Sequence, residues 1–371
     1  MSRSYVLKKD FNDPIVILID DILCRAIKVG ASDIHFEVTP APSFLRVRYR
    51  IDGILYDQEP VMSDQSLPVL SRIKVLSSID IAQRRVPQDG KFIVNFSSRN
   101  IDLRVSTFPS VYGEKIVVRI LDRHLKDISL SSLGCSQNLL NRVKKVITKS
   151  HGFFLVTGPT GSGKTTTLYA ILSKLNDPKI NIVTLEDPVE YHINGITQSQ
   201  INPKSGFTFE SGLRSMLRQD PDVVMVGEIR DRQTAQIAIE AALTGHLVLS
   251  TLHTNDSVSA ITRLIDMGIE PFLVSACLTG VLAQRLVRKL CNFCKFEKED
   301  KTFFSKGCKY CFGLGHRGRT GIFEFLDIDE KIRRLIIERA DSSKILSHST
   351  KKGMTFLSDD ALEKSRAGVI L

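Results

Sequence analysis

One nine-residue segment restricts the fold of this chain more than any other. It matches the pattern of a glycine, four residues and Gly-Lys-Ser/Thr that forms a phosphate-binding loop, and its residues are Gly158, Pro159, Thr160, Gly161, Ser162, Gly163, Lys164, Thr165 and Thr166. An apolar run at 153–157 precedes it as a short buried strand, and apolar residues follow Lys164 with helical spacing. The motif therefore stands at the strand-to-helix turn that such loops require.

The residue types of this segment suit a nucleoside triphosphate. Glycines allow backbone N–H groups to surround phosphate oxygens, and the N-terminus of the following helix adds partial positive charge. Lys164 would neutralise the β- and γ-phosphates, and Thr165 would offer its hydroxyl to Mg²⁺. A glycine-rich turn that matches by chance is the alternative, but the flanking strand and helix argue against it.

Composition limits the class of protein. With 371 residues the chain should hold about two domains, and its composition is that of a soluble globular protein. The longest apolar candidate, 271–283, is too short to span a membrane, and the first ten residues lack an apolar signal core, so we expect a cytoplasmic protein.

The net charge of +10 would suit nucleic acid, an acidic lipid surface or an acidic partner, or would simply confer solubility. Basic residues are spread along the chain without a lysine-rich tail or interleaved aromatics, so we expect no direct binding of nucleic acid.

Residues 1–128 are predicted to form an α+β domain that ends in a polar linker at 122–127. Asp13 and Pro14 are an N-cap and first-turn proline, and they begin an amphipathic helix that ends near Gly30. Further expected elements are a basic-faced hairpin at 45–56, a helix at 67–79 and strands at 92–96, 101–106 and 116–121.

Residues 129–371 are predicted to form an α/β domain. Helices are expected at 137–147, after Lys164, at 209–219 and at 233–243, and strands at 153–157, 182–185, 223–226 and 246–251. This alternation implies a parallel sheet with helices on both faces and nucleotide at the carboxyl ends of the strands.

Two of these strands end in acidic residues. The strand at 182–185 leads into the acidic segment 186–190, and the strand at 223–226 leads into Gly227 and Glu228. One acid would manage Mg²⁺ and the other would polarise the attacking water, whereas single acids at such positions often only cap an element. His246 and His253 flank the next strand, where they are either structural or able to sense the γ-phosphate and couple neighbouring sites.

Four of the seven cysteines form two C-x-x-C pairs, Cys291 with Cys294 and Cys308 with Cys311. They lie in a polar, lysine-rich segment with too few apolar residues to fold unaided, and four thiolates at this spacing can bind Zn²⁺ tetrahedrally. We expect a structural zinc site rather than redox-active dithiols.

Several long motifs, in this order, resemble those of the type II secretion and type IV pilus assembly ATPases. In the α/β part the motifs are the phosphate loop, Glu186-Asp187-Pro188-Val189-Glu190, the segment from Gly212 to Asp222, Val226-Gly227-Glu228-Ile229-Arg230-Asp231 and Thr244-Gly245-His246. In the first domain they are 31–37, 48–53, 84–90 and 104–115. The resemblance runs from about Pro14 to Gly368 and implies a RecA-like ATPase domain preceded by a PAS-like α+β domain.

The resemblance also implies roles for individual residues. Glu190 matches the family's catalytic glutamate and Glu228 its Walker B acid, a ligand of Mg²⁺. Four arginines match those that reach ATP, some of them from a neighbouring subunit, namely Arg104, Arg119, Arg214 and Arg218. On spacing alone, Arg214 and Arg218 are equally well explained as a solvated helix face.

The cysteine segment, 289–317, resembles the tetracysteine insert of assembly and secretion members, and a helical region is expected at 328–371. The long N-terminal module that many members use for docking is not found, so the chain is expected to be either a short-form member or a truncated one.

The resemblance implies a hexameric ATPase, peripheral to the inner membrane, that drives assembly of pilins or pseudopilins. Its expected cofactors are ATP, Mg²⁺ and Zn²⁺, and its expected partners are a membrane platform protein and a membrane-anchored adaptor. The alternatives are a RecA-like ATPase that translocates nucleic acid and a nucleotide-gated scaffold without significant turnover.

Overall fold

The computed structural model describes residues 4–6, 13–41, 43–97, 99–121 and 129–371. The polar linker expected at 122–127 lies outside these residues. The chain divides into two compact units, one made of residues 1–126 and 307–317, the other of 127–306 and 318–371. Among the described residues, no helix combines the length and apolar character needed to cross a bilayer.

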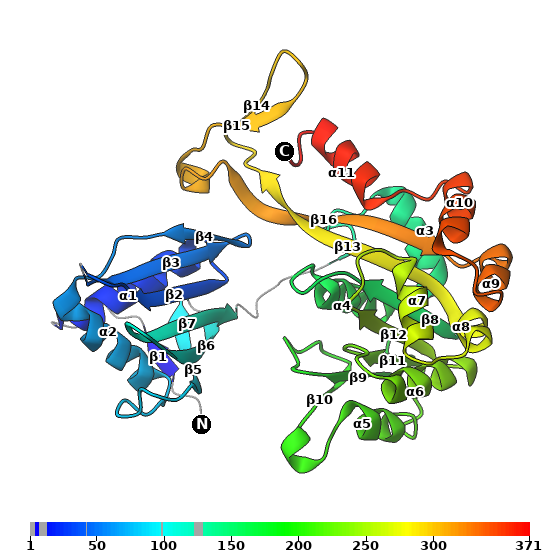
Figure 1. The fold of residues 1–371 in the computed structure, drawn as a ribbon, viewed down its shortest axis with the longest axis horizontal. Coiled ribbons are helices and arrows are strands. Elements are labelled where there is room, and N and C mark those ends of the chain that lie inside the picture. The colour runs from blue at the N-terminus through cyan, green and yellow to red at the C-terminus, as the bar shows by residue number, and fades with distance from the viewer. Residues whose placement is uncertain (1–3, 7–12, 42, 98, 122–128) are drawn as a thin grey trace. The chain divides into compact units, whose positions relative to one another are not determined.

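The first unit is built on a seven-stranded sheet in the order β1-β5-β6-β7-β2-β3-β4 (Figure 1). The strands are β1 (Ser4–Val6), β2 (Asp33–Val38), β3 (Leu45–Ile51), β4 (Ile54–Asp57), β5 (Gln88–Phe96), β6 (Arg99–Ser110) and β7 (Gly113–Leu121). All pairs are antiparallel except β1 with β5. The strands of this unit therefore follow the mixed α+β pattern expected from the sequence.

Side-chain alternation separates the two faces of this sheet. In β3 the residues Leu45, Val47, Tyr49 and Ile51 are buried, and the three arginines between them are only partly covered. The buried face packs with residues of α1 (Pro14–Lys28) and α2 (Ser63–Leu76) in one core. The other face is polar and carries most of the unit's strand arginines.

The helices of this unit begin and end for local reasons. The Asp13 side chain accepts a hydrogen bond from the Ile15 amide at 2.8 Å, which confirms the predicted N-cap of α1. Helix α2 begins at Ser63, four residues before the predicted start, because polar residues 63–66 join the helix without adding to its apolar face. It ends at Leu76, so the buried residue Ile79 belongs to the loop that follows and not to the helix.

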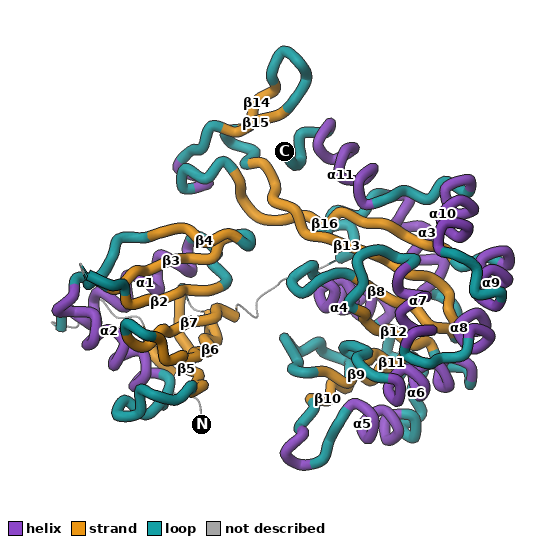
Figure 2. Tube along the Cα trace, viewed as in Figure 1, coloured by secondary structure: helices purple, strands orange, loops and turns teal. Residues whose placement is uncertain are grey.

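The second unit contains a seven-stranded sheet in the order β10-β9-β11-β12-β8-β13-β16 (Figure 2). Its strands are β8 (Gly152–Thr157), β9 (Ile182–Glu186), β10 (Thr197–Gln200), β11 (Val223–Val226), β12 (Leu247–Leu252), β13 (Leu278–Leu290) and β16 (His316–Asp327). The pairs from β10 through β13 are parallel, which confirms the predicted sheet type.

Both faces of the central strands of this second sheet, β8, β9, β11 and β12, are buried. Along β8, Phe153 and Leu155 join one core, whereas Phe154 and Val156 join another. The first core includes residues of α5 (Phe209–Met216), α6 (Arg232–Leu243), α7 (Ser259–Asp266) and α8 (Pro271–Cys277), and the second includes residues of α3 (Gln137–Ile147) and α4 (Lys164–Leu175). Two-sided burial explains why β8 is a continuous apolar run and not an alternating one.

The C-terminal part adds α9 (Glu330–Ile337), α10 (Ser342–Lys351) and α11 (Leu357–Arg366), in agreement with a helical region after residue 328. The short strands β14 (Lys295–Glu297) and β15 (Phe303–Ser305) pair between the two cysteine motifs. Short 3₁₀ turns occur at 203–205 and 309–311. The sequence did not predict the long strands β13 and β16. The apolar run at 271–283 is divided in the structure between helix α8 and the start of β13.

Candidate functional site

The phosphate loop connects β8 to α4, as the sequence predicts. Helix α4 begins at Lys164, and Gly163 precedes it with φ +87°, a left-handed conformation that favours glycine. Gly158 has φ +152°, and a Cβ atom there would lie 2.5 Å from the carbonyl oxygen of Gln284. These two positions require glycine, one for its conformation and the other for the close approach of β13.

Lys164 is folded back over the loop. Its ammonium donates hydrogen bonds to the carbonyl oxygens of Gly158 at 2.9 Å and Pro159 at 3.1 Å. Burial lowers the pKa of Lys164, and the charge of Glu228 acts in the opposite direction. The ammonium therefore lies within the loop, near the Glu228 carboxylate.

The side chain of Gln284, on β13, binds the phosphate loop, and the sequence did not predict this contact. Its amide nitrogen donates to the carbonyl oxygen of Ser162 at 2.6 Å, and its amide oxygen accepts from the Thr167 hydroxyl at 2.7 Å. The side chain is buried, so both bonds are shielded from water. Nothing in the local sequence marks this glutamine, because its partners lie 117 and 122 residues away.

The strand order brings the ends of β8, β12 and β11 together. The Thr157 hydroxyl, at the end of β8, donates to the Leu252 carbonyl oxygen at 3.0 Å. On the next strand over, the Thr251 hydroxyl donates to the Gly227 carbonyl oxygen at 2.8 Å. The loop, the residues after β12 and the residues after β11 thus share one edge of the sheet.

Glu228, Arg230 and His253 form a charged cluster at this edge. The Glu228 carboxylate is paired with Arg230 and lies 3.1 Å from Nε2 of His253. Partial burial by itself would raise the pKa of Glu228, but the hydrogen bonds from Arg230 and His253 bring it below its usual value. Glu228 is therefore a carboxylate held ionised at the end of a strand beside the phosphate loop, a position suited to Mg²⁺.

The other predicted acids lie farther along the same edge, because β11 and β12 separate β9 from β8. Glu186 is buried and accepts hydrogen bonds from the hydroxyls of Tyr169 and Thr184, and a third from Gln198 at 3.1 Å. Its oxygens are thus engaged within the protein. Glu190 is exposed in the loop that follows, and its backbone amide donates to the Tyr169 hydroxyl at 3.3 Å.

The predicted arginines of this unit are exposed. Arg214 lies on α5, 3.4 Å from Glu210. Arg218 follows the end of that helix and donates to the Arg214 carbonyl oxygen at 2.9 Å. The two are therefore linked through the backbone, and Arg218 is outside the helical face that the i, i+4 spacing suggested.

The predicted arginines of the first unit are Arg104 on β6 and Arg119 on β7, directly opposite one another in the sheet. Both are exposed, and Arg119 donates to Asp33 of β2 at 2.9 Å. They therefore form an adjacent pair of cations on the polar face.

The two predicted histidines lie at opposite ends of the sheet. His253 follows β12 and joins the Glu228 cluster. Nδ1 of His246 lies 2.9 Å from the Ala241 carbonyl oxygen, at the start of the strand and the opposite end of the sheet. Of the two, only His253 belongs to the candidate site.

Two oxygen ligands are available for Mg²⁺. One is the exposed hydroxyl of Thr165, in the first turn of α4, and the other is the ionised carboxylate of Glu228. Both are hard oxygen ligands of the kind that Mg²⁺ prefers.

The four cysteines of the two C-x-x-C motifs come together. Their sulfur atoms lie within 4.8 Å of one another, and those of Cys308 and Cys311 are 3.7 Å apart. Tetrahedral zinc with Zn–S bonds near 2.3 Å separates its sulfurs by about 3.8 Å. The amides of Cys308 and Gly315 also donate to the Cys311 sulfur, which suits a thiolate. The donor set therefore fits a structural zinc ion.

Comparisons with known proteins agree with this geometry. The family model described as "Type II/IV secretion system protein" matches residues 8–371. A Vibrio cholerae protein named "Type II secretion system ATPase E" is 48% identical over 380 residues, which cover 98% of this chain and 75% of that protein.

Two solved structures share the fold. The Legionella pneumophila ATPase DotB has a TM-score of 0.72 at 22% identity, and the match covers 100% of this chain and 97% of the other. The pilus retraction motor PilT with bound ADP has a TM-score of 0.64 at 26% identity, with 95% and 94% covered.

Proposed function

The chain belongs to the type II/IV secretion system protein family, and on that premise we propose how its residues carry out ATP hydrolysis in a secretion or pilus-type motor. The protein is an ATPase of this family. The observation that carries the proposal is the shared sheet edge, where the phosphate loop meets a carboxylate held ionised by Arg230 and His253. A phosphate loop alone binds nucleotide, whereas hydrolysis also needs metal, a base and positive charge for the transition state.

The residues divide these tasks as follows. The backbone N–H groups of the phosphate loop, other than that of Pro159, which has none, would hold the β- and γ-phosphates together with the ammonium of Lys164. The hydroxyl of Thr165 and the carboxylate of Glu228 would hold Mg²⁺. Glu190 orients and deprotonates the attacking water, since its side chain is exposed and that of Glu186 is engaged by Tyr169 and Thr184. His253 senses whether the γ-phosphate is present and is coupled to Glu228 through the contact between their side chains.

Arginines complete the site from outside the phosphate loop. Arg104, Arg119, Arg214 and Arg218 contact the phosphates, and those of the first unit do so on the nucleotide of a second copy. Arginine suits this task because its planar group donates to two phosphate oxygens at once. Such a site is complete only in an assembly, and we propose that the assembly is a homohexamer. A lone chain would then bind ATP but hydrolyse it poorly.

The domains and partners follow from the same proposal. In this proposal residues 1–128 are the α+β domain and 129–371 the ATPase domain, with segment 307–317 of the latter grouped with the first compact unit. A zinc ion is bound by the four cysteines. The assembly acts in the cytoplasm at the inner membrane, where a platform protein and a membrane-anchored adaptor couple it to pilins or pseudopilins. The Vibrio cholerae relative is named an ATPase of a type II secretion system and PilT a pilus retraction motor, and both names support a proposal of this class.

Mixing two inactive variants tests the shared site. Lys164→Ala removes the phosphate-loop cation, and Arg104→Ala removes a cation of the first unit. In a mixed assembly, some sites combine the intact loop of the Arg104→Ala chain with the intact arginine of the Lys164→Ala chain. We expect each variant alone to lack turnover and the mixture to regain it. Unaltered turnover in Lys164→Ala would contradict the ATPase assignment of the loop, and a mixture without activity would contradict sharing between copies.

A further inference from the structure

A row of cations crosses the polar face of the first unit's sheet. Lys91 of β5 is directly opposite Arg104 of β6, and Arg104 is directly opposite Arg119 of β7. Arg119 is in turn opposite Asp33 of β2. Directly opposed residues on adjacent strands point to the same face with Cβ atoms about 5 Å apart, so the three basic side chains stand side by side on that face.

The row carries excess positive charge. Of its three cations, only Arg119 has an ion pair among the described residues, with Asp33 at 2.9 Å. Lys91 and Arg104 are exposed, and among the described residues neither side chain makes a hydrogen bond or an ion pair. Like charges directly opposite one another destabilise a sheet, so the arrangement has no structural benefit.

The backbone that presents Lys91 is fixed by buried contacts. The Lys91 amide donates to the Ser77 carbonyl oxygen at 3.3 Å, and a Cβ atom on neighbouring Gly90 would lie 2.3 Å from that oxygen. The loop before β5 therefore packs directly against the strand, and only glycine fits at this contact.

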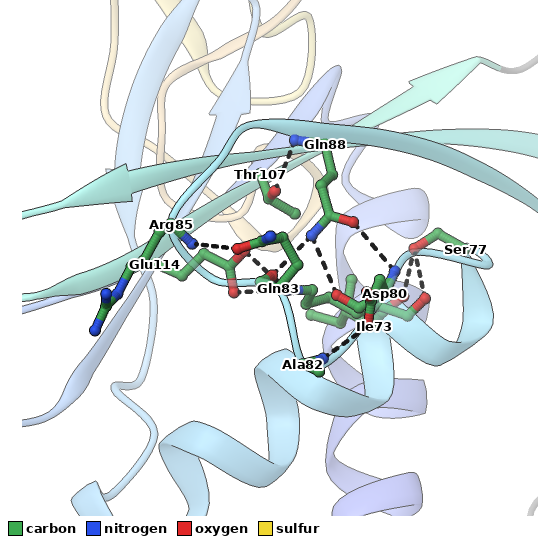
Figure 3. A network of polar contacts seen from close by, with 10 residues as sticks. Ile73, Ser77, Asp80, Ala82, Gln83, Arg85, Gln88, Thr107 and Glu114 are labelled. Carbon is green, nitrogen blue, oxygen red and sulfur yellow. Dashed lines mark hydrogen bonds and ion pairs between the residues drawn. The ribbon is translucent and has the colours of Figure 1, made fainter.

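Figure 3 shows the network that holds the same loop. The Gln88 amide donates to the Thr107 hydroxyl at 3.1 Å, which joins β5 to β6 three residues along the strands from Lys91 and Arg104. The Gln88 side chain binds Asp80 and the Gln83 carbonyl oxygen. That same oxygen accepts from the buried ammonium of Lys74, which is paired with Glu114 at 2.9 Å. The backbone of Lys91 thus belongs to a part of the sheet held by several hydrogen bonds, which favours a preorganised ligand contact.

We propose that Lys91 is a third phosphate-contacting residue of the first unit, which acts together with Arg104 and Arg119 on the polyphosphate chain of bound ATP. An extended anion with several charges can meet all three cations, whereas a single carboxylate can meet only one or two of them. The inference rests on the proposed function, since it assigns the row to the nucleotide held by the phosphate loop of a neighbouring copy.

The test compares the ATPase kinetics of three assembled variants. Lys91→Ala should lower kcat/KM about tenfold or more, the usual effect of losing one hydrogen bond to a charged group. Lys91→Arg keeps the charge and should restore most of the activity. Lys28→Ala is the matched control, because Lys28 is an exposed lysine at the end of α1 and not on the sheet. Thermal unfolding of each variant shows whether the fold is intact.

The outcomes separate this inference from the proposed function. A folded Lys91→Ala protein with unaltered kcat/KM, beside an inactive Arg104→Ala protein, would overturn the role of Lys91 and leave the function standing. Unaltered activity in both would overturn the assignment of the whole row. If Lys91→Ala unfolds, Lys91→Gln and Lys91→Arg replace it, and equal activity in these two would also overturn the role, because only arginine keeps the charge.

Discussion

The buried amide oxygen of Gln284 accepts a hydrogen bond from the Thr167 hydroxyl, with 2.7 Å between the two oxygens. The bond joins β13 to the first turn of the helix that follows the phosphate loop, and the same side chain also binds the loop at Ser162. The shape of the loop therefore depends on a strand more than one hundred residues farther along the chain.

Replacing this glutamine tests that dependence. Gln284→Ala leaves the Thr167 hydroxyl and the Ser162 carbonyl oxygen buried without a partner, at a cost of about 1–3 kcal/mol each. We expect a lower free energy of unfolding and weaker ATP binding, measured by denaturant titration and by calorimetry. Gln236→Ala is the control, since among the described residues the side chain of Gln236 has one hydrogen bond, to Glu240 of the same helix α6. Nucleotide affinity equal to that of the wild type would contradict the role of Gln284 in shaping the loop.

Replacing Glu190 should affect turnover, whereas replacing Glu186 should affect stability. Glu190→Gln should keep ATP binding and lower kcat by about 10²–10⁴-fold, as expected when a general base is removed. Glu186→Gln should chiefly lower stability, because it disturbs the bonds to Tyr169, Thr184 and Gln198. Steady-state kinetics and thermal unfolding of the two variants separate these effects. Normal turnover in Glu190→Gln would move the role of base to Glu228 or Glu186.

Acid pH should selectively weaken the C-terminal helices. Burial by itself would raise the pKa of Asp329, but hydrogen bonds from His348 and the Ile332 amide lower it to about 2. A carboxyl with a lowered pKa adds stability above its unfolded value of about 3.9, and that stability is lost as pH falls toward 2. Asp329→Asn should therefore unfold at a lower temperature than the wild type at pH 7, and the difference should shrink between pH 4 and pH 2. A difference independent of pH would contradict the ionic origin of the effect.

The cysteine cluster should contain one zinc ion per chain. Structural zinc contributes on the order of 10 kcal/mol to the folding of small modules, so chelation should lower the unfolding temperature. Cys308→Ser should have the same effect and lose the metal. Cys135→Ala is the control, because Cys135 lies outside the cluster and burial raises the pKa of its thiol to about 12. Metal analysis by mass spectrometry checks the stoichiometry, and purified protein without zinc would end the assignment.

Much of the site was predictable because its signals are local. The phosphate-loop spacing gave the strand, the loop and the helix, and the apolar runs after it predicted a parallel sheet with helices on both faces. Glu228 and His253 were identified as residues that follow buried strands. The two C-x-x-C motifs predicted four sulfurs close together, and the described sulfurs meet that expectation.

Other features have no local signal. Periodicity marks a strand without giving its neighbours, so the sequence could not tell that β11 and β12 separate Glu186 from the phosphate loop. The same limit applied to His246, whose position at the start of β12 removes it from the site. The spacing of Arg214 and Arg218 suggested one helical face, but α5 ends at Met216.

The sequence by itself determined the candidate chemistry of this protein: a phosphate-loop motif, acids and a histidine after strands, and four thiols at metal-binding spacing. Each depends on residue types at short, fixed spacing, where backbone geometry alone decides which groups meet. Tertiary structure decided which groups share a site, through the strand order that places Glu228 beside the loop, the buried contact of Gln284 and the register that sets Lys91 beside Arg104. These relationships depend on packing between distant segments, and a shift of one residue in register would turn Lys91 to the opposite face of the sheet.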